Sequence, residues 1–342
     1  SAGNGWMRQE DRFSGNIAGK EQKNYTLLHK GELSYNHGNS KLAKYGTVFS
    51  LQTYEEALVP RVYHSFRVEK GSADFVEYYF VTKLPDRELG KLISSGARMD
   101  GLLNIGFDEF MGITLMFPED QEQERIATCF RQLDNLITLH QRKCDQAKKL
   151  KKYMLQKMFP KNNESVPEIR FEGFSNDWEQ RKLGEMGQTY TGLSGKTKDD
   201  FGHGQARFVT YMNVFSNPIS NPEMTEPIEI DPKQNEVEVG DVFFTTSSET
   251  PEEVGMSSIL LEKRGKTYLN SFCFGFRPSE KIDSYYLAYM LRSESTRAKI
   301  ILLAQGISRY NISKNKVMEI AVSLPSLDEQ KMIGQYFSQL DN

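Results

Sequence analysis

The chain contains the same stretch of sequence twice. Residues 117–135 recur as residues 324–342, so that the two stretches lie 207 residues apart. Matched pairs at this offset are Pro118 and Pro325, Gln123 and Gln330, Ile126 and Ile333, Phe130 and Phe337, Asn104-Ile105 and Asn311-Ile312, and Tyr78-Tyr79 and Tyr285-Tyr286. A repeat at a fixed offset indicates that each copy folds as the same structural unit. We therefore predict a chain made of two similar units.

The same offset predicts that neither copy is whole. The second copy opens at Pro167, and the equivalent position in the first copy would fall before Ser1. The second copy stops at Asn342, whereas a helical pattern continues in the first copy well beyond the equivalent Asn135. We therefore expect the opening of the first unit and the end of the second long helix to be missing from this sequence.

Each copy has the same order of predicted elements. Strand patterns, which are short runs of β-branched and aromatic residues between turn residues, cover residues 237–244, 258–261 and 271–277. A short helix is expected at 284–291 and at 75–81, and one more strand at 320–324 and at 113–117. A proline and a long helix close each copy. The fold class is therefore α+β, with two repeated α/β domains that are each followed by a long helix.

The long helix of the first copy carries a seam with alternating spacings of four and three residues. Its members are Ile126, Phe130, Leu133, Ile137, His140, Cys144, Ala147, Lys151, Met154 and Met158. This spacing is the heptad pattern of helices that wind around one another, and the two polar members are interpreted as breaks that set the register. The second copy begins the same seam with Ile333, Phe337 and Leu340. We predict that the two helices pair antiparallel as a coiled-coil spacer between the α/β domains.

Composition narrows the class of protein. The formal net charge is −3, so that any nucleic-acid binding is expected to be local or shared with a more basic partner. No apolar run is long enough for a transmembrane helix, and no secretory signal is visible. The three cysteines, Cys129, Cys144 and Cys273, are scattered and indicate reduced thiols in a cytoplasmic protein. Neither the cysteines nor the five histidines have the spacing of a metal site, and no cofactor is expected.

Two motifs of the second copy resemble a known family. Pro325-Ser326-Leu327-Asp328-Glu329-Gln330 followed by Phe337-Ser338-Gln339-Leu340-Asp341, and Phe174 followed by Asp177-Trp178-Glu179-Gln180-Arg181-Lys182-Leu183-Gly184, resemble specificity subunits of Type I restriction-modification systems. The resemblance extends over essentially the whole chain. It implies two target recognition domains, at 1–117 and 161–324, with conserved spacer helices at 118–160 and 325–342.

The resemblance also implies function and partners. Each recognition domain would read one half of a bipartite double-stranded DNA target, and the helices would dock two DNA methyltransferase subunits, which restriction (nuclease-translocase) subunits then join. The basic tract from Arg142 to Lys161 fits either a solvated helix end or a docking face for partners and DNA. No membrane contact is implied.

The motifs that could indicate a catalytic site are either incomplete or have a simpler interpretation. Gly192-Leu193-Ser194-Gly195-Lys196-Thr197 looks like a phosphate-binding loop, but Tyr190 stands where that motif requires a glycine. Asn217-Pro218 and Asn221-Pro222 are turn sequences, and the carboxylates are not clustered. We therefore predict a non-catalytic subunit. Two alternatives remain at this point: a two-domain nucleic-acid binder without a methyltransferase partner, and an enzyme with an unfamiliar site.

Candidate DNA contacts are polar and cationic residues in the loops of both copies, because such side chains bind base edges and phosphates. In the first copy they are Asn4, Trp6, Arg8, Asn36, Asn39, Lys41 and Arg98. In the second copy they are Lys196, Thr197, Lys198, Tyr211, Asn213, Thr245, Thr246, Ser247, Ser308, Arg309 and Tyr310. The two copies differ most in these loops and least in their helices, as expected for two domains that share a scaffold and recognise different half-sites.

Overall fold

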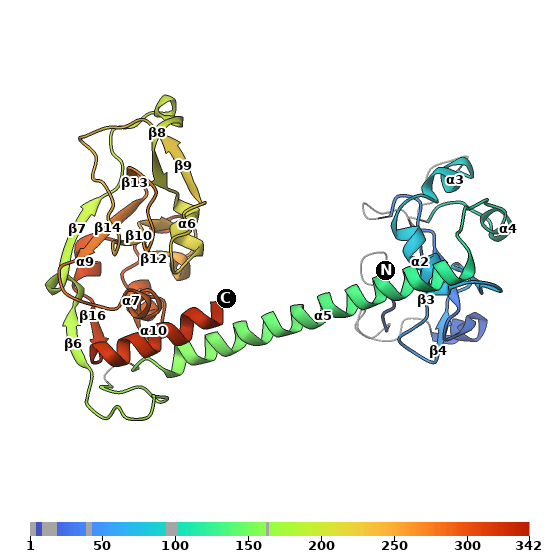
Figure 1. Cartoon of the computed structure of the whole chain (residues 1–342), viewed down its shortest axis with the longest axis horizontal. Helices are drawn as coiled ribbons and strands as arrows, with labels where there is room; N and C mark the ends of the chain where they lie inside the picture. Colours follow the sequence, from blue (N-terminus) through green and yellow to red (C-terminus); the bar gives the residue numbers. More distant parts are fainter. Residues whose placement is uncertain (1–4, 9–18, 39–42, 94–101, 162–163, 342) are drawn as a thin grey trace. The chain divides into compact units, whose positions relative to one another are not determined.

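The computed structural model of the protein describes residues 5–8, 19–38, 43–93, 102–161 and 164–341. The chain divides into two compact units, Ser1–Gln141 and Arg142–Asn342, and the division falls inside the long helix α5 (Asp120–Lys157). Figure 1 shows the elements of each unit. Each unit is described here by itself.

Unit 1 combines short strands with helices. In chain order it contains η1 (Gly19–Asn24), β1 (Thr26–His29), β2 (Leu33–Asn36), β3 (Thr47–Ser50), β4 (Glu56–Val59), β5 (His64–Phe66), α2 (Ala73–Val81), α3 (Asp86–Lys91), α4 (Phe107–Met111) and the first part of α5. Antiparallel strands form one sheet in the order β3-β2-β5 and a second of β1 and β4. The core lies where the first sheet meets α2 and α4, with Tyr35 stacked on Phe110 at a centroid distance of 4.2 Å.

Unit 2 combines many short β-strands with helices (Figure 1). After α5 it contains β6 (Glu179–Lys182), η2 (Leu183–Glu185), β7 (Gly187–Thr191), η3 (Lys198–Asp200), β8 (Phe201–Val209), α6 (Tyr211–Ser216), β9 (Thr225–Ile228), β10 (Val242–Thr245), β11 (Ser247–Ser248), η4 (Pro251–Glu253), β12 (Ser257–Ile259), β13 (Thr267–Leu269), β14 (Cys273–Pro278), α7 (Ser284–Leu291), α8 (Glu294–Ile301), β15 (Tyr310–Asn311), α9 (Lys314–Met318), β16 (Ala321–Leu324) and α10 (Leu327–Asp341).

The strands of unit 2 form several small sheets. The largest has the antiparallel order β12-β10-β14-β7. A second sheet, β13-β8-β9, has one parallel pair, β13 with β8. Two-stranded pairs join β16 to β6 and β11 to β15. The main core lies between the large sheet, α7 and α10, where Phe159, Trp178, Tyr286 and Phe337 pack together.

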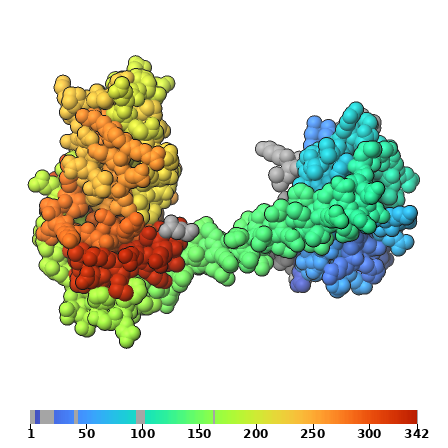
Figure 2. Space-filling view, viewed as in Figure 1, coloured from blue at the N-terminus to red at the C-terminus, as the bar shows by residue number. Residues whose placement is uncertain are grey.

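Within unit 2 the last turns of α5 lie antiparallel to α10. The Nζ atom of Lys151 is 2.6 Å from Asp341 Oδ2, at the end of α10, and Phe159 stacks on Phe337, one turn earlier, at 5.8 Å. Residue numbers therefore rise along one helix as they fall along the other. Figure 2 shows α10 at the surface of this unit against the end of α5.

The same set of contacts occurs within each unit, at the start of its long helix. Gln330 Nε2 donates to the Pro325 carbonyl at 2.9 Å, and its Oε1 accepts from the Asp283 amide, which precedes α7, at 3.0 Å. In unit 1, Gln123 binds the Pro118 carbonyl at 2.8 Å and the Ser72 amide, which precedes α2, at 3.2 Å.

These contacts correct one pairing of the sequence repeat. Ser72 and Asp283 occupy the same cap position, but they are four residues further apart than the 207-residue offset. The structural counterpart of Tyr78 is therefore Tyr289, one helical turn beyond Tyr285. The pairing of Tyr78-Tyr79 with Tyr285-Tyr286 was wrong because the segment between the short helix and the long helix is four residues longer in the first copy: Gln123 follows Ser72 by 51 residues, whereas Gln330 follows Asp283 by 47.

Element bounds match the sequence prediction for helices better than for strands. Helix α7 spans the predicted residues, and α2 begins two residues earlier than predicted. The strand predicted from residue 237 begins at Val242, because Asp241 closes a turn in which its Oδ2 accepts from the Glu238 amide at 2.8 Å. Residues 113–117, which the structure describes, form no strand. A strand requires a partner: their counterpart β16 pairs with β6, whereas no described segment of unit 1 pairs with residues 113–117.

Candidate nucleic-acid interface

Thr246 joins two loops of unit 2. Its amide and its Oγ1 both donate to the carbonyl of Phe272, at 2.9 and 2.8 Å. Its own carbonyl accepts from the amide of Ile312 at 3.0 Å. The loop between β13 and β14 and the segment after α8 are therefore both tied to the strand end that carries Thr246.

The segment after α8 is a tight hairpin. Gln305 and Asn311 exchange two backbone hydrogen bonds of 2.9 Å around a tip of five residues, 306–310. Gly306 begins the tip with φ of 141°, and a Cβ there would lie 2.0 Å from the Arg309 carbonyl oxygen, so that only glycine fits. Ile307, Ser308 and Arg309 are exposed. The hairpin presents an apolar, a hydroxyl and a cationic side chain on a fixed backbone.

Tyr211 brings helix α6 to the same place. Its hydroxyl donates to the Ser247 carbonyl at 2.7 Å, and β11, which contains Ser247, pairs with β15 at the base of the hairpin. Burial raises the pKa of Tyr211, while a hydrogen bond with Thr245 and the charge of Arg309 oppose the rise. Arg309 therefore lies within electrostatic reach of Tyr211. We define the interface cluster as Tyr211, Thr246, Ser308, Arg309 and Tyr310.

Several predicted contact residues of unit 2 are engaged inside the fold. Asn213 is fully buried, and its Nδ2 donates to the carbonyls of Asn221 and Met224 at 2.8 and 3.1 Å. Thr245 is fully buried and its Oγ1 accepts from the Met256 amide at 3.0 Å, and Ser247 is buried. These side chains hold the loops in place and are left out of the interface cluster.

In the Lys196-Thr197-Lys198 segment, the first two side chains bind other residues of the fold and the third does not bind any described residue. Lys196 Nζ lies 2.9 Å from Asp231 Oδ2, and this hydrogen bond contributes most to the lowered pKa of Asp231. Thr197 Oγ1 donates to Asp200 at 2.9 Å. Lys198 is exposed and forms no ion pair with any described residue. Of the two lysines, only Lys198 therefore presents a charge that is not paired with a described residue.

In unit 1 the described candidates have partners too. Trp6 Nε1 donates to the Ser50 carbonyl at 2.7 Å, and the indole packs on the small cluster of Leu28, Leu51 and Val59. The exposed Arg8 guanidinium lies 5.7 Å from the centroid of the Tyr54 ring. Asn36 Oδ1 accepts from the Gly38 amide at 3.0 Å. Asn4, Asn39, Lys41 and Arg98 lie outside the described residues.

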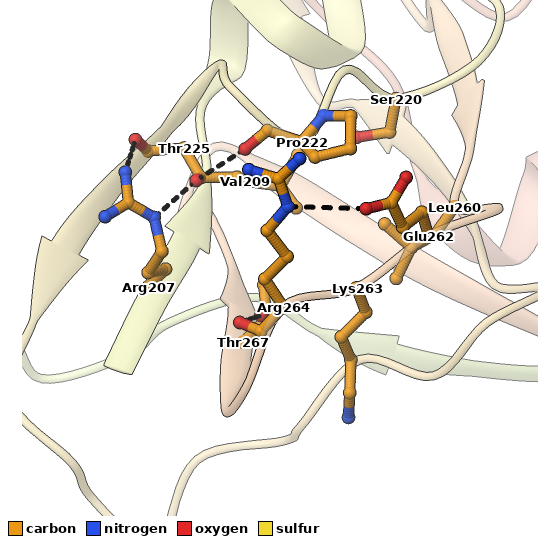
Figure 3. Close-up of a pocket in the computed structure, with 10 residues that line it drawn as sticks. All are labelled: Arg207, Val209, Ser220, Pro222, Thr225, Leu260, Glu262, Lys263, Arg264 and Thr267. Carbon is orange, nitrogen blue, oxygen red and sulfur yellow. Dashed lines mark hydrogen bonds and ion pairs between the residues drawn. The ribbon is translucent and has the colours of Figure 1, made fainter. Parts of the chain in front are cut away.

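A pocket near β8 and β9 offers no free cation, although three basic residues line it. Arg207 Nε donates to Thr225 Oγ1 at 2.6 Å, and Arg264 binds Glu262 (Figure 3). Arg264 also binds Glu223, and Lys263 binds Glu236. The lining residues are Arg207, Val209, Ser220, Pro222, Thr225, Leu260, Glu262, Lys263, Arg264 and Thr267.

The described residues contain no group of three His, Cys, Asp or Glu side chains that could hold a metal ion. No helix among them has both the length and the apolar character needed to cross a membrane.

Comparison with known proteins identifies the family. Residues 175–342 match the family model described as the Type I restriction modification DNA specificity domain, and this range contains the whole interface cluster. The chain belongs to the specificity subunits of Type I restriction-modification systems.

Two relatives in Methanocaldococcus jannaschii resemble this specificity subunit. The Type I restriction enzyme MjaVIII specificity subunit is 24% identical over 266 residues, which are 73% of this chain and 60% of that protein. A protein named for the MjaX specificity subunit is 25% identical over 243 residues, 67% of this chain and 53% of that protein. The chain thus spans between about half and three fifths of the length of these relatives.

Solved structures resemble the specificity subunit in fold. A chain from a study of complex assembly and conformational transition of the type I R-M system matches with a TM-score of 0.51 and 14% identity, covering 92% of this chain and 75% of that one. The Type I restriction-modification S subunit from M. genitalium matches with a TM-score of 0.50 and 15% identity, covering 93% and 77%. Both likenesses support the mixed helix-and-strand fold class.

Sequence reasoning missed one residue of the specificity subunit that the structure brings to this surface. Phe272 is exposed and is tied to Thr246, but an aromatic residue at the start of a predicted strand gives no sign of exposure. The available signal was Asn270, whose Oδ1 accepts from the Phe272 amide at 2.8 Å in a local turn of the kind that asparagine favours.

Proposed function

We propose that this specificity subunit reads a bipartite double-stranded DNA target for a Type I restriction-modification complex and carries no catalytic site itself. The observation that carries the proposal is the match of residues 175–342 to a DNA specificity domain. The loops of that domain present Arg309 and Lys198 as exposed cations without ion-pair partners among the described residues. Such side chains bind phosphates or base edges.

Each unit would read one half of the target. In this proposal the recognition domains are residues 1–117 and 161–324, and their spacer helices are 118–160 and 325–342. Shared contacts of Gln123 and Gln330 support a common scaffold in the two units. The loops differ: the carbonyl of His37 accepts from the Leu103 amide in unit 1, whereas the carbonyl of Thr246 accepts from the Ile312 amide in unit 2. Different residues at equivalent positions fit two different half-sites.

The long helices would form the spacer and the docking surface. The antiparallel contact of α5 with α10 inside unit 2 supports such a pairing. Phe337 of α10 is 0% exposed in that contact, whereas its counterpart Phe130 in unit 1 is 48% exposed. An exposed heptad seam of this kind favours a further helical partner. We propose that two methyltransferase subunits and the restriction subunits assemble on this part of the chain, in the cytoplasm.

A methylation map tests the proposal. The chain would be expressed from its natural gene with its methyltransferase partner in a host without DNA methylation, and modified adenine would be located by sequencing. We expect one split motif with an unread gap. Exchanging residues 1–117 for those of another specificity subunit should change one half of the motif and leave the other half intact.

The control is the same methyltransferase with a different specificity subunit, which shows that the enzyme is active. If that pair methylates DNA and the pair with this chain does not, the docking proposal is wrong. Tight specific binding by the isolated chain in the same series would then favour a nucleic-acid binder that acts alone.

A further inference from the structure

Two large apolar side chains project from the loops that Thr246 joins. Ile307, at the tip of the hairpin, is 96% exposed, and Phe272, in the loop between β13 and β14, is 55% exposed. Neither is needed to fill the core of unit 2. Thr246 anchors both loops through its two donors and its carbonyl, and exposed apolar side chains in one region of a surface are a feature of binding sites.

The backbone under Phe272 is held on both sides. Its amide donates to Asn270 Oδ1 at 2.8 Å, and its carbonyl accepts from both Thr246 donors. The Cys273 amide donates to the Asn270 carbonyl at 3.1 Å, which closes the turn. The ring therefore projects from a fixed base, and ordering it on a ligand costs only side-chain freedom.

The backbone under Ile307 is held as firmly. The paired Gln305 and Asn311 close the hairpin, and β15 binds it to β11. Arg309, two residues beyond Ile307, is exposed and forms no ion pair with any described residue. The carboxylate of Glu253 in the adjoining loop accepts from Ser248 Oγ and Thr250 Oγ1 at 3.3 and 3.0 Å. That carboxylate is thus engaged locally, and the cation is available to a ligand.

An apolar tip beside a free arginine fits a particular feature of duplex DNA. Proteins that deform DNA insert isoleucine, phenylalanine or similar side chains between stacked base pairs, and arginine next to such a wedge binds the backbone or the minor groove. We propose that Ile307 and Phe272 form an apolar wedge that enters a base step of the half-site read by unit 2, with Arg309 on the adjacent phosphate. The inference rests on the proposed DNA-reading function and assigns it a site.

The wedge explains a contribution to specificity that needs no hydrogen bond to a base. Steps of a pyrimidine followed by a purine unstack most easily, so that the wedge favours such a step at its place in the target. Hydrogen-bonding side chains elsewhere in the loops would read the neighbouring base pairs. Because the deformation is local, it concerns one step of the motif.

The test uses the assembled methyltransferase complex and a duplex with its own target. 2-Aminopurine, whose fluorescence rises on unstacking, is placed at each position of the target in turn. With the natural chain we expect raised 2-aminopurine fluorescence at one base step, in addition to the raised fluorescence at the methylated adenine, which the methyltransferase flips out. In Phe272→Ala and Ile307→Ala this signal should fall to the background level, while the signal at the methylated adenine remains. The dissociation constant should rise about tenfold or more in the double variant.

Val239→Ala is the matched control, because Val239 is an exposed apolar residue of the same unit outside this surface. It should change neither the fluorescence nor the affinity. Unchanged melting temperatures would show that the alanine variants fold, as expected for exposed side chains. The wedge proposal is wrong if the natural chain gives no raised fluorescence at a base step besides the target adenine, or if the alanine variants keep that raised fluorescence. Absence of any specific binding by the natural complex would instead overturn the proposed function.

Discussion

The hydroxyl of Tyr289 donates a 2.8 Å hydrogen bond to Oδ2 of Asp341 and so joins α7 to the end of α10. The ring of Tyr289 also packs on Phe337 at a centroid distance of 5.2 Å. In unit 1, Tyr78 binds Asp134 at 2.7 Å and packs on Phe130 at 5.3 Å. The same pair of contacts thus fixes the short helix to the long helix in both units.

Tyr289→Phe should destabilise unit 2. Burial and the bond to Asp341 raise the pKa of Tyr289, so that the hydroxyl remains a donor at neutral pH. Removing it leaves a partly buried carboxylate oxygen with Lys151 as its one partner among the described residues, and we expect a loss of about 1 kcal/mol in the free energy of unfolding. Urea denaturation measures the change. Tyr78→Phe is the control, and its cost should be smaller because that bond is exposed to water; an equal cost would contradict this reasoning.

Arg292→Met should lower the free energy of unfolding by more than Tyr289→Phe does. Arg292 donates to the carbonyls of Ser257, Val214, Phe215 and Asn217 at 2.7–3.0 Å, and thereby holds the end of α6 against β12. Burial and the nearby charge of Arg297 lower its pKa to about 10, and the charge of Asp341 only partly opposes this. We expect the free energy of unfolding to fall by at least about 2 kcal/mol, because several carbonyls lose their donor.

Arg292→Lys is the informative companion of Arg292→Met. A lysine keeps the charge but not the planar fork of donors, and it should recover only part of the lost stability. Full recovery in thermal unfolding would mean that the charge, and not the geometry of the bonds, matters at this position.

His203 should titrate above the ordinary histidine range. Its Nδ1 lies 3.0 Å from Glu229 Oε1 and its Nε2 lies 2.8 Å from the Asp199 carbonyl, and these bonds raise its pKa above 6.5. A raised pKa in the folded state means that the contribution to stability is complete below pH 6.5 and is lost as the pH rises through the folded-state pKa. An NMR titration should show the shift, and Glu229→Gln should reduce it. A pKa unchanged by that substitution would exclude the ion pair in solution.

Lys198 and Lys196 should differ in their effect on DNA binding. Lys198 has no ion pair among the described residues, so that Lys198→Ala should reduce the slope of log Kd against log salt by about one. Lys196 is bound to Asp231, and Lys196→Ala should leave this slope unchanged while it raises the pKa of Asp231. Binding titrations of the methyltransferase complex at several salt concentrations measure both. Equal slopes for the two variants would exclude Lys198 from phosphate contact.

Much of this protein is already determined by local sequence. Each copy of the repeated motif, the heptad spacing of the long helix and the bounds of α7 depend on residues close together in the chain. Such periodicity survives in any context that lets the helix form, because helix geometry repeats every 3.6 residues. The same local motifs carried the resemblance to the family.

Only the tertiary structure decided which polar loop residues face the solvent. Asn213 and Thr245 have the side chains of DNA contacts but are buried, whereas Phe272 has the side chain of a core residue and is exposed. Exposure depends on contacts between distant segments, such as the one between Thr246 and Phe272, and a one-dimensional pattern does not contain them. For the same reason, the turn-length shift that aligns Tyr78 with Tyr289 emerged only from the hydrogen bonds at the helix ends.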